Sequence, residues 1–329
     1  MRRQRLHRQQ FVQLCIALAL AAALVGCSPG ARQPTAAQPS ALAPVVASAL
    51  PQFKHIFIIV MENKEYTQVI GNPKAPYLNR LASQYGLATN YYGIRHPSLP
   101  NYLALTGGST FGITSDCVDC VVDQPNIVDQ LEGSGRSWKA YIESMPQPCF
   151  LGNDGPLYRQ KHNPFIYYKN VRSNPARCGK IVPFDELATD LSSNSLPEYV
   201  WISPNMCSDG HDCPTQRGDD WLGEWVPKIL ASPAWKDDGV LFITYDEADS
   251  HLQPSDSCCE EGHGGHVATL VISPLSKPGY QSKVPYDHYS LLRTIEDAWD
   301  LPTLGGASCD CAPPMGDFFE TRPVAGDGK

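Results

Sequence analysis

Four continuous apolar runs are the feature that most restricts how this chain can fold. They are rich in Val, Ile, Phe and Tyr and lie at residues 55–61, 198–203, 240–245 and 267–273. Apolar runs of this length, without polar alternation, are typical of strands that are covered on both faces, as in a parallel sheet.

Segments with helical spacing of apolar residues lie between these runs. They end at glycine or proline and occupy residues 75–86, 101–108, 219–233 and 288–302. Glycine and proline are the residues that commonly terminate helices. The alternation of strands and helices predicts an α/β fold, a three-layer α/β/α sandwich around a largely parallel sheet.

The N-terminal residues have the composition of an export signal and a tether. Residues 1–26 contain four arginines followed by an apolar run that is too short for a confident membrane span. This run ends in LVGC, which resembles a lipobox with Cys27 as the lipidated residue; an ordinary secreted protein or an uncleaved anchor are the alternatives. Residues 27–52 are rich in Pro, Ala and Ser and predict a flexible tether.

These segments predict an exported bacterial lipoprotein whose folded domain covers residues 53–329. We expect it to face the periplasm or to sit on the outer membrane, and to be secreted if the anchor is absent. Its anchoring partner is then the membrane itself, through the lipid on Cys27.

The charge of the chain restricts its partners. The formal net charge is −8, and loss of residues 1–26 makes it −12 because four arginines and no acid are removed. An acidic surface argues against nucleic acid as a partner. Any anion that this domain binds must therefore meet a local positive site, which a metal ion could supply.

The cysteines favour disulfides. Without Cys15 in the signal and Cys27 at the lipid site, ten of the twelve cysteines remain, an even number in an exported chain. CVDC at 117–120 has a zinc-like gap but lacks a matching second pair. The preferred pairings are Cys149 with Cys178 and Cys207 with Cys213, whereas the adjacent Cys258 and Cys259 cannot readily pair with each other. Two further close pairs are Cys117/Cys120 and Cys309/Cys311.

Polar residues stand at the ends of the predicted strands. Glu62 and Asn63 follow the first run, and Asp246 and Glu247 follow the third. The second run leads into a loop and the fourth is preceded by HGGH; together these segments carry Asp209, His211, Asp212, His263 and His266. Because ligands of open α/β sheets lie outside the carboxyl ends of the strands, three of these clusters should meet at one edge.

The acidic pairs predict a site for a divalent metal. Carboxylates brought together repel one another unless a cation or protons compensate. Oxygen ligands favour a hard ion such as Mg²⁺, Ca²⁺ or Mn²⁺. For either pair taken alone, a helix cap or a solvated loop is the alternative.

Ser98 is the candidate nucleophile. It lies in HPSLPNYLAL (96–105), between two prolines and at the start of a helical segment, where serine is also a favoured N-cap. A nearby metal would lower the pKa of its hydroxyl for attack on phosphorus. We expect the side chain of Asn101 to bind a phosphate oxygen, and the histidines to bind phosphate or protonate a leaving group. These histidines are His96, His211, His263 and His266. A second metal near Asp209 and His211 is left open.

The ordered motifs resemble a known family. HIFIIVMENKEY, HPSLPNYLALTGG, SPNMCSDGHDC, GDDWL, ITYDEAD and DHYSLLRTIEDAWDLP occur in that order between residues 55 and 302. They are similar to the bacterial phosphoesterase family, which holds secreted acid phosphatases and phospholipases C and belongs to the alkaline phosphatase superfamily. The resemblance implies a metal-dependent acid phosphatase, acting on phosphate monoesters that include phosphoinositides through a phosphoserine.

The resemblance also implies roles for individual residues. One metal would be bound by Glu62, Asn63, Ser98, Asp246 and Glu247. Asn101, His211 and His266 would bind phosphate or transfer protons. His96, Asp209, Asp212 and His263 are expected beside the site in supporting positions, and the insert at 250–265 leaves the choice between His263 and His266 open.

Two other functions fit the same residues. A phosphodiesterase of the phospholipase C type would use the same nucleophile and metal, although no long apolar lid is evident in the sequence. A surface lipoprotein that binds ligand without catalysis is the other alternative. The full set of metal and nucleophile candidates argues against this second alternative.

Overall fold

A nine-stranded mixed sheet forms the centre of the protein. The computed structural model describes residues 50–249 and 262–320, and its main strand order is β4-β3-β5-β1-β6-β7-β2-β8, with β9 also paired to β2. The strands are β1 (His55–Met61), β2 (Gly86–Tyr92), β3 (Trp138–Ile142), β4 (Ile181–Pro183), β5 (Tyr199–Ser203), β6 (Gly239–Tyr245), β7 (His266–Ile272), β8 (Gln281–Ser282) and β9 (Tyr286–Asp287). β7 runs antiparallel to both of its neighbours, and every other strand pair is parallel. The expectation of a largely parallel sheet is thus confirmed.

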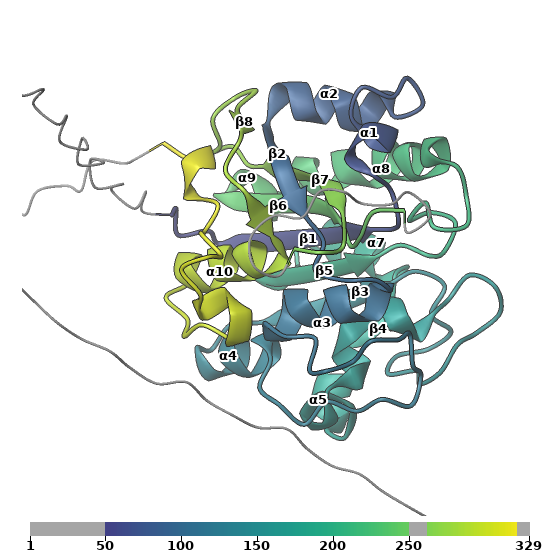
Figure 1. Cartoon of the computed structure of the whole chain (residues 1–329). Coiled ribbons are helices and arrows are strands. Elements are labelled where there is room, and N and C mark those ends of the chain that lie inside the picture. Colours follow the sequence, from purple (N-terminus) through teal and green to yellow (C-terminus); the bar gives the residue numbers. More distant parts are fainter. Residues whose placement is uncertain (1–49, 250–261, 321–329) are drawn as a thin grey trace, which may run out of the picture. The chain divides into compact units, whose positions relative to one another are not determined.

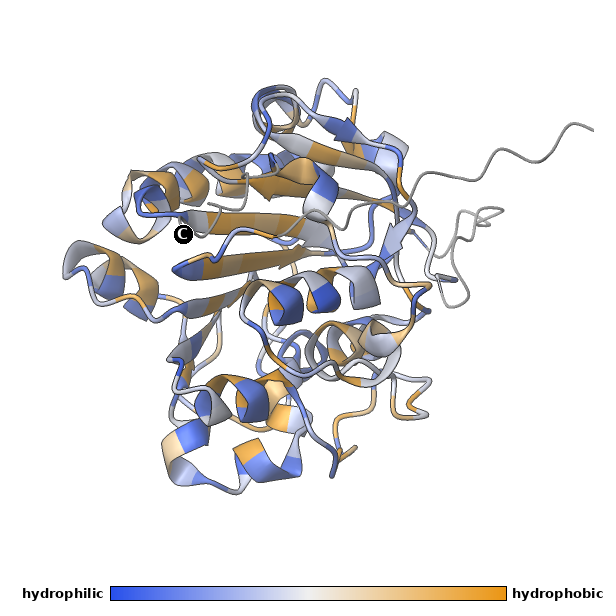
Figure 2. Cartoon of the chain, turned by 90° about the vertical axis from the view of Figure 1, so that its left-hand side faces the viewer, coloured by the Kyte–Doolittle hydropathy of each residue, from blue (hydrophilic) through white to orange (hydrophobic). Residues whose placement is uncertain are grey.

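Helices cover both faces of this sheet, as the three-layer prediction requires (Figures 1 and 2). α2 packs against α8 on one face, and α3 packs against α10 on the other. The α-helices are α1 (Tyr66–Val69), α2 (Pro76–Gln84), α3 (Ser98–Gly107), α4 (Ile127–Gly133), α5 (Lys169–Arg172), α6 (Pro175–Cys178), α7 (Glu186–Ser192), α8 (Thr215–Ala231), α9 (Pro233–Lys236) and α10 (His288–Ala298). The 3₁₀ helices are η1 (Gln160–His162), η2 (Pro164–Tyr167), η3 (Gly305–Ser308) and η4 (Gly316–Phe318).

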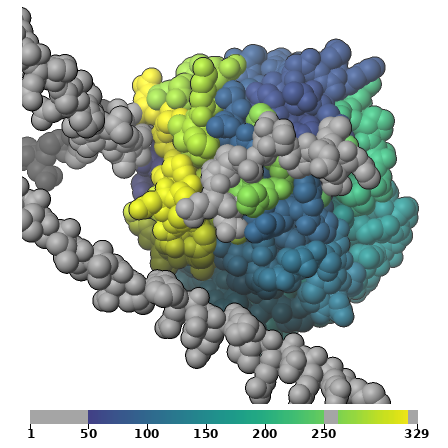
Figure 3. Space-filling view, in the orientation of Figure 1, coloured from purple at the N-terminus to yellow at the C-terminus, as the bar shows by residue number. Residues whose placement is uncertain are grey.

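The apolar runs form the core because both of their faces are covered. All residues of β6 are buried, as are those of β1 after His55. The middle strands are accordingly the most uniformly apolar part of Figure 2, whereas the helices on either side show both colours. Burial of this kind contributes about 25 cal/mol for each Å² of apolar surface removed from water. Figure 3 shows the blue segment that contains α3 and α4 next to the yellow C-terminal segment on one face.

Asp219 of α8 fixes the start of α2. Its two carboxylate oxygens accept hydrogen bonds from the backbone N–H groups of Tyr77 and Leu78, at 2.9 and 2.7 Å. These N–H groups belong to the first turn of α2, where no helical partner is available. The GDDWL motif therefore has a structural role, which is to join two helices on the same face.

Four disulfides join cysteines within the described residues. The expected pairs Cys149–Cys178 and Cys207–Cys213 are present, together with Cys117–Cys120 and Cys309–Cys311. The zinc alternative for Cys117 and Cys120 is therefore wrong, because these two cysteines form a disulfide. Cys258 and Cys259 lie outside the described residues, as do the expected signal, Cys27 and most of the tether. Within the part of the chain that is described, no helix has the length and apolarity needed to cross a membrane.

Glu296 gives a prediction for the pH dependence of stability. The side chain is fully buried in α10; its Oε1 accepts from Gln130 Nε2 and Leu304 N, whereas Oε2 has no donor among the described residues. Burial raises the pKa of Glu296 from 4.5 to about 7. The folded state therefore retains the proton up to pH 7, and its stability relative to the unfolded chain declines as the pH rises from about 4.5 through 7.

We expect Glu296→Gln to remove this decline. At pH 8.5 the variant should be more stable than the wild type by at most about 3 kcal/mol, and at pH 5 the two should be similar. Urea unfolding at both pH values measures the difference. Glu224→Gln, at an exposed glutamate, is the control and should change neither value. An equal effect of Glu296→Gln at both pH values would contradict the explanation.

Candidate active site

Three strand ends bring the predicted acids together. β5, β1 and β6 are adjacent and parallel, so their carboxyl ends meet at one edge of the sheet. The Glu62 N–H donates to Asp209 O at 3.0 Å, and the Asp246 N–H donates to Met61 O at 2.9 Å. The Asn63 N–H donates to Asp246 Oδ1 at 3.2 Å. The meeting of these clusters, predicted from the positions of the strands, is thus observed.

Gly93 allows the loop before Ser98 to approach the Asp246–Glu247 turn. A Cβ at Gly93 would lie 2.7 Å from Asp246 O, which excludes any larger residue without a backbone shift. The Gly264 N–H donates to Gly93 O, the Gly93 N–H donates to Gly265 O, and Gly264 O accepts from the Ala248 N–H. The glycines of HGGH therefore hold two active-site loops together. From the sequence, only the histidines on either side were expected to have a role in the site.

Asn101 shapes the same loop from within α3. Its Oδ1 accepts from the N–H groups of Ile94 and Arg95, and its Nδ2 donates to the carbonyls of Arg95 and Pro97. All four contacts are to backbone groups just before Ser98. The amide thus positions the nucleophile loop in this structure, and binding of phosphate by Asn101 stays a prediction.

Ser98 lies at the first position of α3, with its hydroxyl directed at two carboxylates. Its Oγ is 3.1 Å from Glu62 Oε2 and 3.4 Å from Glu247 Oε1, and the side chain is fully buried. The expectation that Ser98 caps the helix is wrong: Pro97 is the N-cap residue, and no side-chain cap bond is present. Ser98 is one residue inside the helix, so its Oγ accepts no N–H of the first turn, and its O–H donates toward the carboxylates.

His96 and two residues of the 204–213 loop flank this centre. His96 Nδ1 is 2.6 Å from Glu247 Oε2, and burial lowers the pKa of His96. His211 Nδ1 is 2.7 Å from Asp212 Oδ1, in a loop closed by the Cys207–Cys213 disulfide. Burial and the charge of Lys161 lower the pKa of His211. His96 and Asp212 were expected in supporting positions and His211 in phosphate binding or proton transfer, and these roles stay predictions.

The two histidines of HGGH have different surroundings. The His266 ring stacks on the rings of Tyr66 and Tyr92, with centroids at 4.4 and 5.1 Å, and its Nε2 is 3.0 Å from Thr89 O. His263 is exposed, and its backbone N–H donates to Ile94 O. The structure gives His266 a packing role, and a part in catalysis stays a prediction for both residues.

Four site residues were not foreseen from the sequence. Lys161 Nζ is 3.4 Å from Ser98 Oγ, 3.0 Å from Asp116 Oδ2 and 3.3 Å from His211 Nε2. His162 Nε2 is 3.1 Å from Glu62 Oε2, and His162 Nδ1 is 3.3 Å from Asp209 Oδ2. The Tyr102 hydroxyl donates to Glu62 Oε1. Lys161 and His162 belong to η1, which follows no strand, so the strand-end pattern gave no signal for them.

The acids of the site are crowded in a buried space. Burial raises the pKa of Glu62 and of Asp209 to about 7. Burial and the neighbouring charges of Asp246 and Glu62 raise the pKa of Glu247 to about 10, and the pKa of Asp246 is also raised well above its usual value. Burial lowers the pKa of Lys161, but the carboxylates of Glu62 and Asp116 outweigh it and produce a net rise. The cluster as a whole is therefore short of positive charge.

The donor atoms fit a hard divalent cation. Asn63 Oδ1 and Asp246 Oδ2 are buried and have no hydrogen-bond donor among the described residues. Glu62, His162 and Asp209 can also direct ligand atoms to within 4.8 Å of one another. Oxygen donors predominate, which suits Mg²⁺, Ca²⁺ or Mn²⁺. His162 is a candidate ligand that the predicted set lacked, and Glu62 belongs to both groups of donors.

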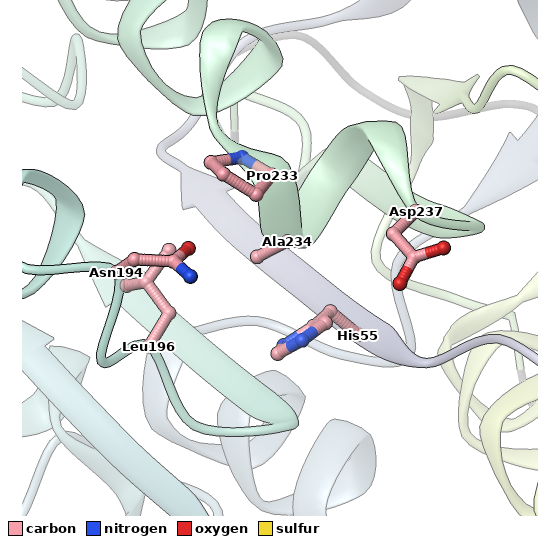
Figure 4. Close-up of a pocket in the computed structure, with 6 residues that line it drawn as sticks. All are labelled: His55, Asn194, Leu196, Pro233, Ala234 and Asp237. Carbon is pink, nitrogen blue, oxygen red and sulfur yellow. The ribbon is translucent and has the colours of Figure 1, made fainter.

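The site is separate from a cavity at the opposite end of β1. That cavity, of about 240 Å³, is lined by six residues that Figure 4 labels. One of them, His55, is the first residue of β1, whereas Glu62 follows its last residue. The cavity therefore lies at the amino edge of the sheet, away from the carboxylates.

Known structures share this fold. A protein of the alkaline phosphatase superfamily from Vibrio parahaemolyticus superposes with a TM-score of 0.55 and 15% sequence identity, over 83% of this chain and 75% of the other. Lipoteichoic acid synthase LtaP from Listeria monocytogenes gives a TM-score of 0.52 and 14% identity, over 82% of this chain and 78% of the other. At these identities the likeness shows the fold.

Sequence relatives are closer. A probable acid phosphatase from Kluyveromyces lactis is 34% identical over 264 residues, which are 77% of this chain and 60% of that protein. A phosphatidylinositol-3-phosphatase from Mycobacterium tuberculosis is 30% identical over 278 residues, or 84% of this chain and 86% of that protein. The chain spans about 60% of the length of the yeast relative and 57% of an Aspergillus fumigatus acid phosphatase that is 31% identical.

A family model gives the assignment for the domain as a whole. The model described as the Phosphoesterase family matches residues 72–302, which include Ser98, Lys161, His211 and the Asp246–Glu247 pair. The match extends over more than half of the chain. This chain is a member of the Phosphoesterase family.

Proposed function

We propose that this protein is a metal-dependent phosphatase that hydrolyses phosphate monoesters with Ser98 as the nucleophile. The observation that carries the proposal is the position of Ser98 Oγ, 3.1 to 3.4 Å from Glu62, Glu247 and Lys161. A hydroxyl between proton acceptors and a cation, at the first turn of a helix, is suited to attack on an anionic phosphorus centre.

The residues can be given roles in two displacements. In the first, Ser98 Oγ forms a bond to phosphorus as the ester P–O bond breaks, and the serine proton passes to Glu62, whose Oε2 lies 3.1 Å from the hydroxyl. The leaving alkoxide takes a proton from His211, whose ring is oriented by Asp212. In the second, water attacks phosphorus as the bond to Ser98 Oγ breaks. His211 takes a proton from the water, Glu62 returns its proton to Ser98 Oγ, and inorganic phosphate is released.

A metal held by Glu62, Asn63, Asp246 and Glu247 would supply positive charge to the phosphoryl oxygens and lower the pKa of the serine hydroxyl. The geometry of the loop contributes independently. Asn101 fixes the backbone before Ser98, which limits the freedom that the nucleophile must lose on reaction.

A sequence relative and the exposed apolar side chains together support an amphiphilic phosphate monoester as the substrate. The mycobacterial relative is named as a phosphatidylinositol-3-phosphatase, and this chain covers 86% of its length. The exposed large apolar side chains of the described residues are Val118, Val121, Leu151 and Leu157. Gln160 joins their two loops by hydrogen bonds to Val118 O and Gly152 N, directly beside Lys161. Apolar side chains next to a phosphate site suit a lipid such as a phosphoinositide, because they can contact its apolar part while the phosphate enters the site.

A phosphodiesterase of the phospholipase C type is the second candidate. A non-hemolytic phospholipase C from Burkholderia pseudomallei is 29% identical, but over 51% of this chain and 31% of that protein.

For the location, we propose an exported lipoprotein anchored through Cys27. The N-terminal composition supports this location.

Ester hydrolysis by the purified full chain tests the proposed function. We expect it to release nitrophenol from p-nitrophenyl phosphate between pH 4 and 9, faster than from bis(p-nitrophenyl) phosphate. Dialysis against EDTA should stop release, and Mg²⁺, Mn²⁺ or Ca²⁺ should restore it. Faster hydrolysis of the diester would favour the phospholipase C reading. No hydrolysis by folded, metal-loaded protein would favour a binding protein.

A further inference from the structure

We propose that Lys161 is the residue that makes this site prefer phosphate monoesters to diesters, by binding the additional charged oxygen of the monoester. Asp116 is its positioning residue. The inference rests on the proposed function, because it assigns the substrate class to a group at the same site.

Lys161 is held in place from both sides. It belongs to η1, whose first residue, Gln160, accepts from Gly152 N and donates to Val118 O, at 2.5 and 2.7 Å. The Gln160 N–H also donates to Asn153 Oδ1 at 3.0 Å. Only 14% of the Lys161 side chain is exposed, so its ammonium group is largely withdrawn from bulk water. A charge in such a place interacts more strongly than one on the surface.

The three N–H groups of the ammonium have distinct neighbours. Asp116 Oδ2 lies at 3.0 Å, His211 Nε2 at 3.3 Å and Ser98 Oγ at 3.4 Å. Asp116 Oδ2 accepts one of these N–H groups throughout the reaction, and His211 Nε2 accepts another while the ring is neutral. The third contact is to the nucleophile, so one N–H is directed at the place where the phosphoryl group must arrive.

Asp116 ties this ammonium to the turn that carries the nucleophile. Its Oδ1 accepts from the Leu99 N–H at 3.0 Å, and its Oδ2 receives the Lys161 bond. The neighbouring Cys117–Cys120 disulfide closes the same loop. Because Leu99 follows Ser98, the carboxylate fixes Lys161 Nζ relative to Ser98 Oγ.

The charges of the site explain why this cation should discriminate. Glu62, Asp246 and Glu247 belong to the cluster around the nucleophile. Their negative charges offset the positive charge of a divalent ion. A monoester dianion brings one more negative charge than a diester, on an oxygen that in a diester carries an uncharged organic group. Lys161 adds one positive charge beside Ser98, which a dianion needs more than a monoanion does.

Steady-state kinetics of Lys161→Gln with the two nitrophenyl esters test the proposal. The full chain, loaded with metal, is compared with Lys161→Arg and with the control Lys169→Gln, which removes an equal charge from an exposed ion pair with Asp123. We expect Lys161→Gln to lower kcat/KM by about 100-fold for p-nitrophenyl phosphate and by less than about 5-fold for bis(p-nitrophenyl) phosphate. Lys161→Arg should recover most of the monoester preference, and Lys169→Gln should change neither rate.

Inorganic phosphate provides a second readout. Its inhibition constant should rise by about 10-fold or more in Lys161→Gln, because the product shares the charge of the monoester. If Lys161→Gln does not fold, Asp116→Asn retains the lysine and an acceptor for Leu99. The Asp116→Asn variant should then lose part of the preference for the monoester, measured as the ratio of kcat/KM for the two esters.

Equal losses on both esters, or no loss, would overturn the assignment of Lys161. A wild-type protein without activity on either ester would instead refute the proposed function itself.

Discussion

Ser98→Ala should reduce phosphate release from p-nitrophenyl phosphate by at least about 10³-fold while leaving the fold intact. The substitution removes the only atom of the side chain that can bond to phosphorus. It also removes the hydroxyl contacts to Glu62 and Glu247, which at 3.1 and 3.4 Å contribute little to folding. Helix α3 keeps its other contacts, including the Asn101 bonds. Initial rates at saturating substrate measure the loss.

The control for this prediction is Ser83→Ala, at an exposed serine of α2. It should keep the wild-type rate. Thermal unfolding of both variants should occur within about 2–4 °C of the wild-type midpoint, the change that corresponds to roughly 1 kcal/mol for a domain of this size. A folded Ser98→Ala protein with full activity would exclude the serine mechanism and move the nucleophile elsewhere.

Asp246→Asn should make the metal-free protein more stable and the enzyme inactive. The carboxylate is fully buried and faces the charge of Glu62, while its Oδ2 has no donor among the described residues. An uncharged amide of the same shape removes this repulsion. In EDTA we expect the variant to unfold at a higher temperature than the wild type, by a few degrees, or about 1–3 kcal/mol.

Metal should reverse the order of stability. A cation at 100 times its dissociation constant stabilises the folded wild type by about 2.7 kcal/mol, and Asp246→Asn should lose most of this gain. Its phosphatase activity should fall by more than about 100-fold. Asp219→Asn is the matched control because Asp219 is buried but binds the N-terminus of α2. It should lower the midpoint equally with and without metal. If the Asp246 variant keeps the full metal-induced shift, this carboxylate is not a ligand.

The strands and the acids that follow them could be predicted because both depend on local pattern. β1 begins at His55 and ends at Met61, the limits of the apolar run, since a buried strand needs uninterrupted apolar residues. Glu62 and Asp246 could be grouped because parallel strands end at the same edge. The assignment of Ser98 to a helix start was also correct, although the capping role was not, because the helix begins at Ser98 and Pro97 is the N-cap.

Lys161 and His162 could not be found in this way. They come from a 3₁₀ helix between distant segments, and their positions depend on hydrogen bonds that join Gln160 to two other parts of the chain, at Val118 and at 152–153. HGGH was misleading for a related reason. Its glycines, which carry no reactive group, place the loop before Ser98 against Asp246 through backbone contacts.

The position of Ser98 beside the acids was implied by the family resemblance of its motif. The sequence by itself determined the α/β sandwich and the edge of the sheet where the acids gather. Each of these depends on hydrophobic periodicity or on residues next to one another in the chain. Only the tertiary structure decided which cationic side chain contacts Ser98 and which histidine contacts Glu62. It also decided which polar side chains bind backbone groups instead of lining the site. Such choices depend on burial and on distances between segments far apart in sequence, where an unpaired charge is most costly and a partner must be supplied.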